Sequence, residues 1–317
     1  MEKLEIYTPI KKIIALLFPL LVAFMLTGFI PAQRQVIDDR LQLKRLTVSS
    51  ASELNEAFEA LGYVWPPQSL IPAIEVSNLP HDLAELPDVQ QKKTLFFRIL
   101  LPIVLAENEK VSELRDYVDR LINKGVMSLD EPELRWLQAI ADKYKVKGSI
   151  YEASAQQRLL RRVDVVPTAL VLAQAANESA WGTSRFARSG NNLFGQWTYR
   201  QSEGIVPLGR PEGASYAVRA FSTIDASVRA YIQNLNTNPA YRELRLMRQE
   251  MRASGQQLDA HQLATGLMAY SERGEEYVRE IQAMMHTNGL LTVLESISLN
   301  RVSDELSLSL QALSMAG

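Results

Sequence analysis

Apolar side chains recur at helical spacing along most of this chain. The clearest case lies in residues 88–144, where they fall three and four positions apart: Phe96, Phe97, Leu100, Leu101, Leu114, Tyr117, Val118 and Leu121. This spacing puts them on one face of a helix. A second helix is predicted from Asp130, an N-cap ahead of Pro132, to about Tyr144, with Gly148 ending the unit.

The remaining helices are predicted by the same spacing, and two segments interrupt it. Helical pattern covers residues 158–181, where Pro167 suits a first helical turn, and four later segments: 225–235, 239–251, 259–270 and 275–285. Five prolines mark residues 65–87 as extended or turn-rich. Repeated Gly and Pro in residues 196–221, followed by alternation through Val218, predict a strand or hairpin. We therefore expect a mainly α (α+β) fold.

The N-terminus carries the longest apolar run of the chain. Ile13–Ala32 holds twenty residues without a charge and follows Lys3, Lys11 and Lys12. About 20 apolar residues can cross a bilayer, and preceding basic residues favour an N-inside orientation. A signal peptide with a long apolar part fits too, but Ala32 ends no clean small-x-small cleavage site, which favours an uncleaved anchor. Either interpretation places the rest of the chain outside the cytoplasm.

Composition removes several classes of function. The net charge of −2 gives no electrostatic case for nucleic acid. The chain has no cysteine, which excludes disulfides, thiolate metal sites and cysteine nucleophiles. Its three histidines, His81, His261 and His286, lack the spacing of a metal site. We therefore expect neither a metal nor a cofactor.

One carboxylate stands out as a candidate for catalysis. Glu178 is the only charged residue between Val165 and Ser184, near the end of an apolar helix that Gly182 is expected to terminate. The negative end of the helix dipole and the apolar surroundings should raise its pKa, as a general acid near neutrality requires. Trp181 could shield this acid or stack on a sugar ring. The alternative is a solvated Glu178 and a core Trp181.

Longer motifs around Glu178 carry a family resemblance. The run 173–182, AQAANESAWG, followed by Asn192-Leu193-Phe194-Gly195, resembles the mannosyl-glycoprotein endo-β-N-acetylglucosaminidase-like peptidoglycan hydrolases (glycoside hydrolase family 73), which include flagellar and autolysin glucosaminidases. The similarity covers roughly residues 159–285 and is strongest to the bacterial Bax proteins. It implies a lysozyme-like helical domain with a small β-lobe beside a glycan groove.

The resemblance also implies roles for single residues. Glu178 matches the family's catalytic acid. The second carboxylate lies in the β-lobe of relatives, so here it would be Glu203 or Glu212; Glu212 is favoured because Pro211 and Gly213 would fix it in a turn, although both could be solvated turn residues. Tyr270 matches a groove tyrosine that would orient the N-acetyl group or the water, with packing at a helix end as the alternative.

Other residues are expected to line the groove. Asn192 would bond backbone or a sugar amide, Phe194 would pack in the groove floor, and Tyr277, Trp181 and Glu203 are further substrate-binding candidates. One position departs from the family: relatives commonly have Tyr-Ala-Thr-Asp where this chain has Tyr270-Ser271-Glu272-Arg273. A role of that aspartate therefore does not carry over to Arg273.

These expectations combine into a domain plan: a signal anchor or signal peptide (1–32), a connector (33–87), a helical accessory region (88–150), a glucosaminidase domain (151–288) and a tail (289–317). The expected reaction is hydrolysis of the β-1,4 bond after N-acetylglucosamine in peptidoglycan, with Glu178 as acid. The rivals are a lytic transglycosylase or muramidase of similar fold and a non-catalytic glycan-binding envelope protein. Expected partners are peptidoglycan strands and the inner membrane, in the cell envelope, with the chain anchored facing the periplasm or secreted into it.

Overall fold

The computed structural model describes residues 42–294 and 296–300. The chain divides into two units, residues 1–42 and 43–317, and the description below concerns the second. The predicted membrane segment Ile13–Ala32 and most of the predicted tail lie outside the described residues. Within the described part, no helix is both long and apolar enough to cross a membrane.

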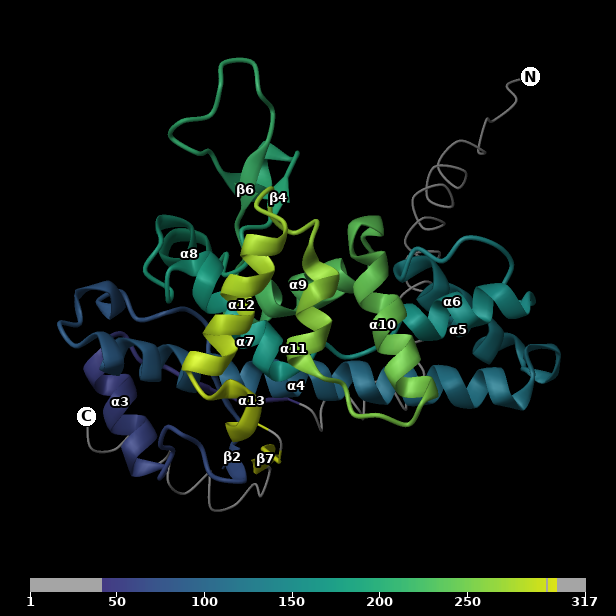
Figure 1. Ribbon diagram of the computed structural model, residues 1–317, viewed down its shortest axis with the longest axis horizontal. Helices are drawn as coiled ribbons and strands as arrows, with labels where there is room; N and C mark the ends of the chain where they lie inside the picture. Colours follow the sequence, from purple (N-terminus) through teal and green to yellow (C-terminus); the bar gives the residue numbers. More distant parts are fainter. Residues whose placement is uncertain (1–41, 295, 301–317) are drawn as a thin grey trace, which may run out of the picture. The chain divides into compact units, whose positions relative to one another are not determined.

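The longest helix, α4 (Val89–Lys124), is common to both halves of the fold (Figure 1). The Asp88 side chain caps its first turn by accepting from the backbone N–H groups of Gln90 and Gln91. The helix ends at Gly125, whose φ of 91° suits a residue without a side chain. Nearly all of residues 95–107 are buried on every side, whereas further along only one face is covered. The first half of α4 is therefore a core helix.

The main hydrophobic core forms around the first half of α4. There α4 packs against α7 (Thr168–Ser179) and α9 (Ile224–Thr237), and α12 (Glu275–Thr287) packs on α7. α7 is apolar almost all round, as expected of a helix enclosed by others. The interior includes Leu100, Leu101, Val171, Leu172, Val228 and Ile281. α7, the helix that carries Glu178, is thus held on several sides.

A second apolar cluster lies between the C-terminal half of α4, α5 (Glu131–Lys143) and α6 (Ala153–Arg162). α5 begins with a capping box formed by Asp130 and Glu133, which confirms the predicted N-cap at Asp130. α4 contributes residues to both clusters, which belong to the same unit. The expected domain boundary at residue 150 stays a prediction.

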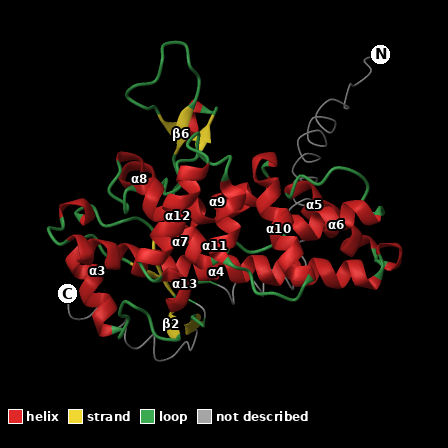
Figure 2. Cartoon of the chain, in the orientation of Figure 1, coloured by secondary structure: helices red, strands yellow, loops and turns green. Residues whose placement is uncertain are grey.

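Three small sheets complete the fold, and with the helices they confirm the predicted mainly α class (Figure 2). The predicted β-lobe is an antiparallel sheet in the order β4 (Trp197–Thr198), β6 (Ala217–Arg219), β5 (Gly204–Ile205). Two parallel pairs lie elsewhere: β1 (Lys44–Leu46) with β3 (Ile74–Val76), and β2 (Leu70–Pro72) with β7 (Ser298–Asn300). The predicted connector contains one α-helix among its described residues, α3 (Ala51–Ala60).

The other helices described are α8 (Arg185–Gly190), α10 (Arg242–Ala253), α11 (Ala260–Leu263) and α13 (Leu290–Val293). The single helix predicted over 259–270 is wrong: α11 is followed by a 3-10 turn, Ala264–Leu267. Gly266 explains the change, because a Cβ atom there would lie 2.5 Å from Leu244 Cα in α10. The backbone of this segment therefore packs directly against a neighbouring helix.

Candidate active site

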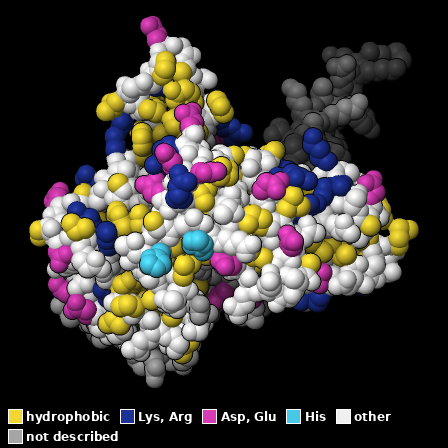
Figure 3. Space-filling model, in the orientation of Figure 1, with side chains coloured by type: hydrophobic (Ala, Val, Ile, Leu, Met, Phe, Trp, Pro, Cys, Tyr) yellow, Lys and Arg dark blue, Asp and Glu magenta, His cyan; other side chains and the backbone are white. Residues whose placement is uncertain are grey.

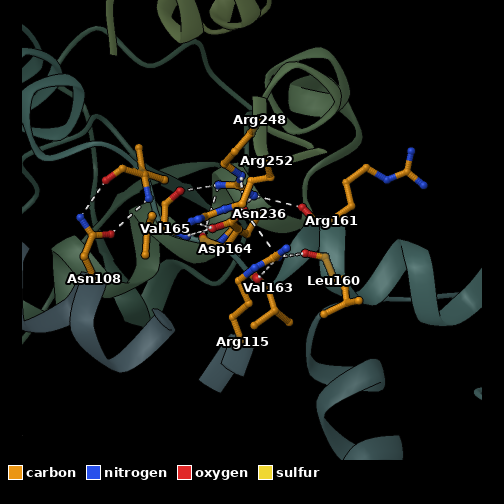
Figure 4. A network of polar contacts seen from close by, with 11 residues as sticks. Asn108, Arg115, Leu160, Arg161, Val163, Asp164, Val165, Asn236, Arg248 and Arg252 are labelled. Carbon is orange, nitrogen blue, oxygen red and sulfur yellow. Dashed lines mark hydrogen bonds and ion pairs between the residues drawn. The ribbon is translucent and has the colours of Figure 1, made fainter. Parts of the chain in front are cut away.

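The segment that leads into α7 is anchored by a buried carboxylate. Asp164 is 2% exposed, and its carboxylate lies 2.7 Å from Arg252 Nη2 and 3.5 Å from Arg115 Nη1 and from Arg248 Nε (Figure 4). Burial by itself raises the pKa of the Asp164 carboxyl, but the three guanidinium groups outweigh it and hold the pKa below its ordinary value. Asp164 is therefore ionised in the folded protein.

The same network holds the backbone before α7. Arg248, fully buried, donates to the carbonyl of Val165 (2.7 Å) and to Asn236 Oδ1 (2.7 Å). Asn108 of α4 pairs with the backbone of Val166 in both directions, at 2.7 and 3.1 Å. These contacts satisfy carbonyls that would otherwise be buried without partners. They fix the start of α7 relative to α4, α9 and α10 (Figure 4).

The C-terminus of α7 differs from the prediction. The helix ends at Ser179, so Gly182 is not the residue that follows its last turn; Ala180 (φ 49°), Trp181 (φ 60°) and Gly182 (φ 78°) are all left-handed. The Ser179 hydroxyl ends the helix by accepting from Gly182 N–H at 2.8 Å, and Trp181 N–H returns to the Ala176 carbonyl. Non-glycine residues in this conformation cost energy, and such strain clusters at functional sites. The reversal directly follows Glu178.

Glu178 is half-buried in the last turn of α7. Burial raises the pKa of its carboxyl above the ordinary value, and this effect exceeds the opposing hydrogen bonds from Tyr277 and Asn177 and the positive charge of Arg273. The predicted direction is thus confirmed, with burial as the main cause. A carboxyl group with a raised pKa retains its proton closer to neutrality, as a general acid must.

A chain of hydrogen bonds reaches Glu178 from the core. Tyr231 donates its hydroxyl proton to Gln174 Oε1, and Gln174 Nε2 donates to the Tyr277 hydroxyl oxygen at 2.7 Å. The Tyr277 proton is then free for its hydrogen bond to Glu178. All three side chains are at most 1% exposed, and burial raises the pKa of both tyrosines, so both remain neutral donors. Gln174 lies one turn before Glu178, on the same helix face.

Tyr270 and Tyr277 lie beside one another, and their contact with substrate stays a prediction. Tyr277 is 1% exposed, and its hydroxyl hydrogen-bonds Glu178. The Tyr270 hydroxyl donates to the Phe194 carbonyl at 2.9 Å, and its ring stacks on Tyr277 with centroids 5.3 Å apart. Phe194 in turn stacks on Tyr231 at 4.0 Å. The contacts of Tyr270 agree with its packing alternative, whereas its role towards the N-acetyl group or the water stays a prediction. Phe194 packs against Tyr231, in agreement with its expected packing.

Asn192 shapes the backbone opposite the acid. Its side chain donates to the carbonyls of Gln196 and Arg219, both at 2.8 Å, and its Oδ1 accepts from the N–H groups of Phe194 and Gln196. Of its two expected partners, the backbone is the one present in the structure, and the side chain is 2% exposed. The turn exposes Gly195, whose φ is 62°. A Cβ atom there would lie 3.5 Å from Glu178 Oε2, so this glycine borders the acid.

Trp181 contacts α4. Its ring lies edge to face with Phe96 and Phe97, at 6.0 and 5.1 Å, and Lys93 Nζ lies 4.7 Å from its centroid. These contacts pack the partly buried Trp181 against the core, while shielding of the acid or stacking on a sugar stays a prediction. The reversal after Ser179 explains this placement, because it turns the chain onto α4.

The two candidate second carboxylates lie in the β-lobe region. Glu203 forms an ion pair with Arg200 at 3.0 Å, with both side chains exposed. Glu212 is exposed in the loop 206–216, which extends away from the helices (Figure 1). Among the described residues, the charged groups that shift the pKa of Glu178 are instead Arg273 and Glu280, which pair with each other. The sequence did not predict the ion pair of Arg273 with Glu280, because Arg273 differs from the aspartate common in relatives and no role carried over to it.

Sequence reasoning also missed an aromatic surface on the β-lobe. Trp197 is 57% and Tyr199 is 80% exposed, and Trp197 lies edge to face with Tyr216 at 5.0 Å. A contiguous exposed apolar patch can mark a binding surface, and these rings neighbour one another on the β-lobe. The only sequence signal was their position a few residues after Gly195, at and just past β4.

Comparisons with known proteins give a family. The family model described as mannosyl-glycoprotein endo-beta-N-acetylglucosaminidase matches residues 153–290. The chain is also similar to "Protein bax" of Escherichia coli (strain K12), at 36% identity over 214 residues, which cover 67% of this chain and 75% of that protein. No solved structure matches significantly. The matched family range contains Glu178, its hydrogen-bond chain and the β-lobe.

Proposed function

This chain belongs to the mannosyl-glycoprotein endo-β-N-acetylglucosaminidase family, and from that premise we propose that it hydrolyses the β-1,4 bond after N-acetylglucosamine in peptidoglycan. One observation carries the proposal: a half-buried Glu178 with a raised pKa beside an exposed glycine turn. Burial thus favours the protonated form of the acid, at a place where substrate can approach.

Glu178 would protonate the glycosidic oxygen as the bond to C1 breaks. The carboxylate left behind accepts the hydrogen bond of Tyr277 and lies in the field of Arg273, and both interactions favour the ionised form. The chain from Tyr231 through Gln174 holds Tyr277 in the donating orientation. Tyr277 and Gln174 therefore act as positioning residues, which prepare the site for the charge that develops on the acid.

Three groups are available for the second chemical role. Glu212 of loop 206–216, or Glu203 of the turn before β5, would activate the water if the β-lobe brings one of them to the sugar. Otherwise the N-acetyl oxygen of the substrate would attack C1. The exposed rings of Trp197 and Tyr199 would hold neighbouring sugars by their apolar faces. These two rings lie on the β-lobe, close in sequence to Gly195, which borders Glu178.

The site supports a second candidate, a lytic transglycosylase. Its basis is that, of the residues described, neither Glu203 nor Glu212 influences the pKa of Glu178. A reaction with one acid and an internal sugar hydroxyl as nucleophile needs no second carboxylate. For either reaction we propose a location in the cell envelope, where the substrate lies.

The deciding experiment is digestion of purified peptidoglycan by the full chain, with mass spectrometry of the products. We expect reducing N-acetylglucosamine ends, and a loss of at least about a hundredfold in rate for Glu178→Gln, as is typical when a general acid is removed. Glu203→Gln and Glu212→Gln test the second carboxylate in parallel.

The other outcomes discriminate between the rivals. Anhydro-muramic ends would establish the transglycosylase reaction. Wall binding without any soluble product from the wild-type chain would support a non-catalytic module. Equal rates for wild type and Glu178→Gln would refute the assignment of the acid.

A further inference from the structure

A cationic pocket lies between α6 and α10, apart from the residues around Glu178. It has a volume of about 310 Å³ and is lined by Arg158, Arg161, Arg162, Pro239, Arg242 and Arg245. Figure 3 shows the corresponding dark blue patch on the upper right of the described surface. Five of the six lining residues are arginines, and no lining residue is acidic.

The charge of these arginines is largely uncompensated. Arg162 donates to the carbonyls of Tyr144 and Lys145, and Arg245 donates to those of Leu235 and Asn238. Carbonyl acceptors orient a guanidinium group but do not neutralise it. Among the lining residues, the ion pair that the structure contains is Arg242 with Glu243, and both of those side chains are more than 60% exposed.

The wall behind the pocket adds positive charge. Arg248 donates to the backbone carbonyl of Arg161, and it shares the single carboxylate of Asp164 with Arg115 and Arg252. Burial, together with the neighbouring charges of Arg162, Arg248 and Arg161, lowers the pKa of Arg245 to about 10. The cations around the pocket therefore repel one another. An anion would relieve this repulsion.

We propose that this pocket binds a phosphate group. Planar guanidinium forks match the oxygen geometry of phosphate and carboxylate. Five arginines in one pocket favour a multiply charged phosphate over a singly charged carboxylate. The volume leaves room beside the phosphate for a small attached group such as a sugar or glycerol. This inference does not depend on the proposed glycan reaction.

The phosphate group could belong to a soluble phosphomonoester or to the headgroup of an anionic lipid surface. The guanidinium groups of the lining arginines would recognise the phosphate in both cases, so the chemistry is shared. The two sources are separated by experiment below.

The first test measures binding of inorganic phosphate to the full chain by calorimetry and by thermal unfolding, against chloride at equal ionic strength. We expect saturable binding and a rise in Tm, because a ligand bound only by the folded state stabilises it. Arg161→Gln/Arg242→Gln should weaken phosphate binding at least tenfold. Without phosphate this variant should unfold no earlier than wild type, since the loss of two cations reduces the repulsion.

The matched control is Arg135→Gln/Arg279→Gln. It removes the same charge from exposed residues of α5 and α12 that pair within their own helices. This control should bind phosphate as wild type does. Equal Tm in phosphate and chloride, or equal weakening by both double variants, would show that binding is absent or reflects net charge alone, and either result overturns the proposal.

The second test identifies the source. Binding of the full chain to phosphatidylcholine vesicles with and without phosphatidylglycerol is compared between wild type and Arg161→Gln/Arg242→Gln, and competition by glycerol phosphate is measured. A phosphatidylglycerol-dependent difference between the two proteins assigns the lipid source. Competition in calorimetry without that difference assigns a soluble phosphomonoester.

Discussion

Glu178 experiences two opposed influences, burial that favours its proton and hydrogen bonds that favour its charge. Burial prevails, so the pKa is raised in the folded protein. The folded state therefore binds more protons than the unfolded chain above the ordinary pKa of glutamate, and the free energy of unfolding falls as the pH rises through this range. Above the folded pKa of Glu178, the carboxyl is ionised in both states, and the free energy of unfolding is lowered by the full cost of burying its charge.

We therefore expect Glu178→Gln to raise the free energy of unfolding at neutral pH. The amide keeps the shape of the side chain and has no charge to bury. The gain should shrink as the pH is lowered towards the ordinary pKa of 4.5, because the wild-type carboxyl then becomes protonated in both states. Urea denaturation of both proteins between pH 4 and 8 measures this difference. A gain that grows on acidification would contradict the assignment.

Tyr277→Phe removes the hydroxyl that lowers the pKa of Glu178. The pKa should rise further, so the protonated acid should persist to higher pH, and the basic limb of the pH–activity profile should move upward. The change also leaves the amide of Gln174 without its buried acceptor, at a cost of about 1–3 kcal/mol in stability. Wall digestion across pH checks the first effect. Tyr151→Phe, at an exposed tyrosine, is the control and should change neither quantity.

At the scale of elements, α7 is defined by how it ends. Gly182 lies where a Cβ atom would be 2.8 Å from Leu79 and 3.1 Å from Leu83 and Phe96, and its φ is 78°. Side chain packing and backbone conformation both require glycine there. The reversal that positions Glu178 thus depends on a residue four positions later.

Gly182→Ala should lower the free energy of unfolding by about 1–3 kcal/mol, through overpacking and backbone strain. Denaturant unfolding measures it. Gly209→Ala is the matched control, because a Cβ atom there meets open space. Equal stability of the two variants would show that the turn after α7 relaxes freely.

Local sequence signals predicted the helix cap at Asp130 and the raised pKa of Glu178, but not contacts between distant segments. The cap at Asp130 depends on Glu133, three residues away, and was predicted. α7 ends earlier than predicted, at Ser179, whose hydroxyl accepts from the Gly182 N–H. The prediction had relied on Gly182 alone to mark the end of the helix. The bond from Gln174 to Tyr277 spans 103 positions, and no local pattern marks it. The approach of Gly266 to Leu244 is likewise tertiary.

At the scale of the whole described unit, Asp164 connects α4 and α10 with the start of α7. Asp164→Asn should cost about 3–5 kcal/mol, because it leaves the buried Arg248 without its counter-charge. The lowered pKa of Asp164 means that its stabilisation is present above the ordinary value of 3.8 and is lost as the pH falls through the folded pKa.

Acid unfolding therefore checks the same prediction. The wild-type chain should lose stability at low pH more steeply than Asp164→Asn, which lacks this titration. Asp142→Asn, at an exposed position of α5, should follow the wild-type curve. If both variants follow it, the Asp164 network contributes nothing to acid stability.

The parallel pairing of β2 with β7 has a consequence for synthesis of the chain on the ribosome. Leu70 pairs with Ser298, about 230 residues apart in sequence, and this contact closes the largest loop among the strand pairs described. A chain emerging from its N-terminus can form α4 and α7 early, but β2 must wait unpaired until β7 has been made. During that interval an open strand edge is exposed, a known template for association with other chains. A released chain truncated before residue 298 should therefore engage chaperones longer than a released chain that includes residues 298–300.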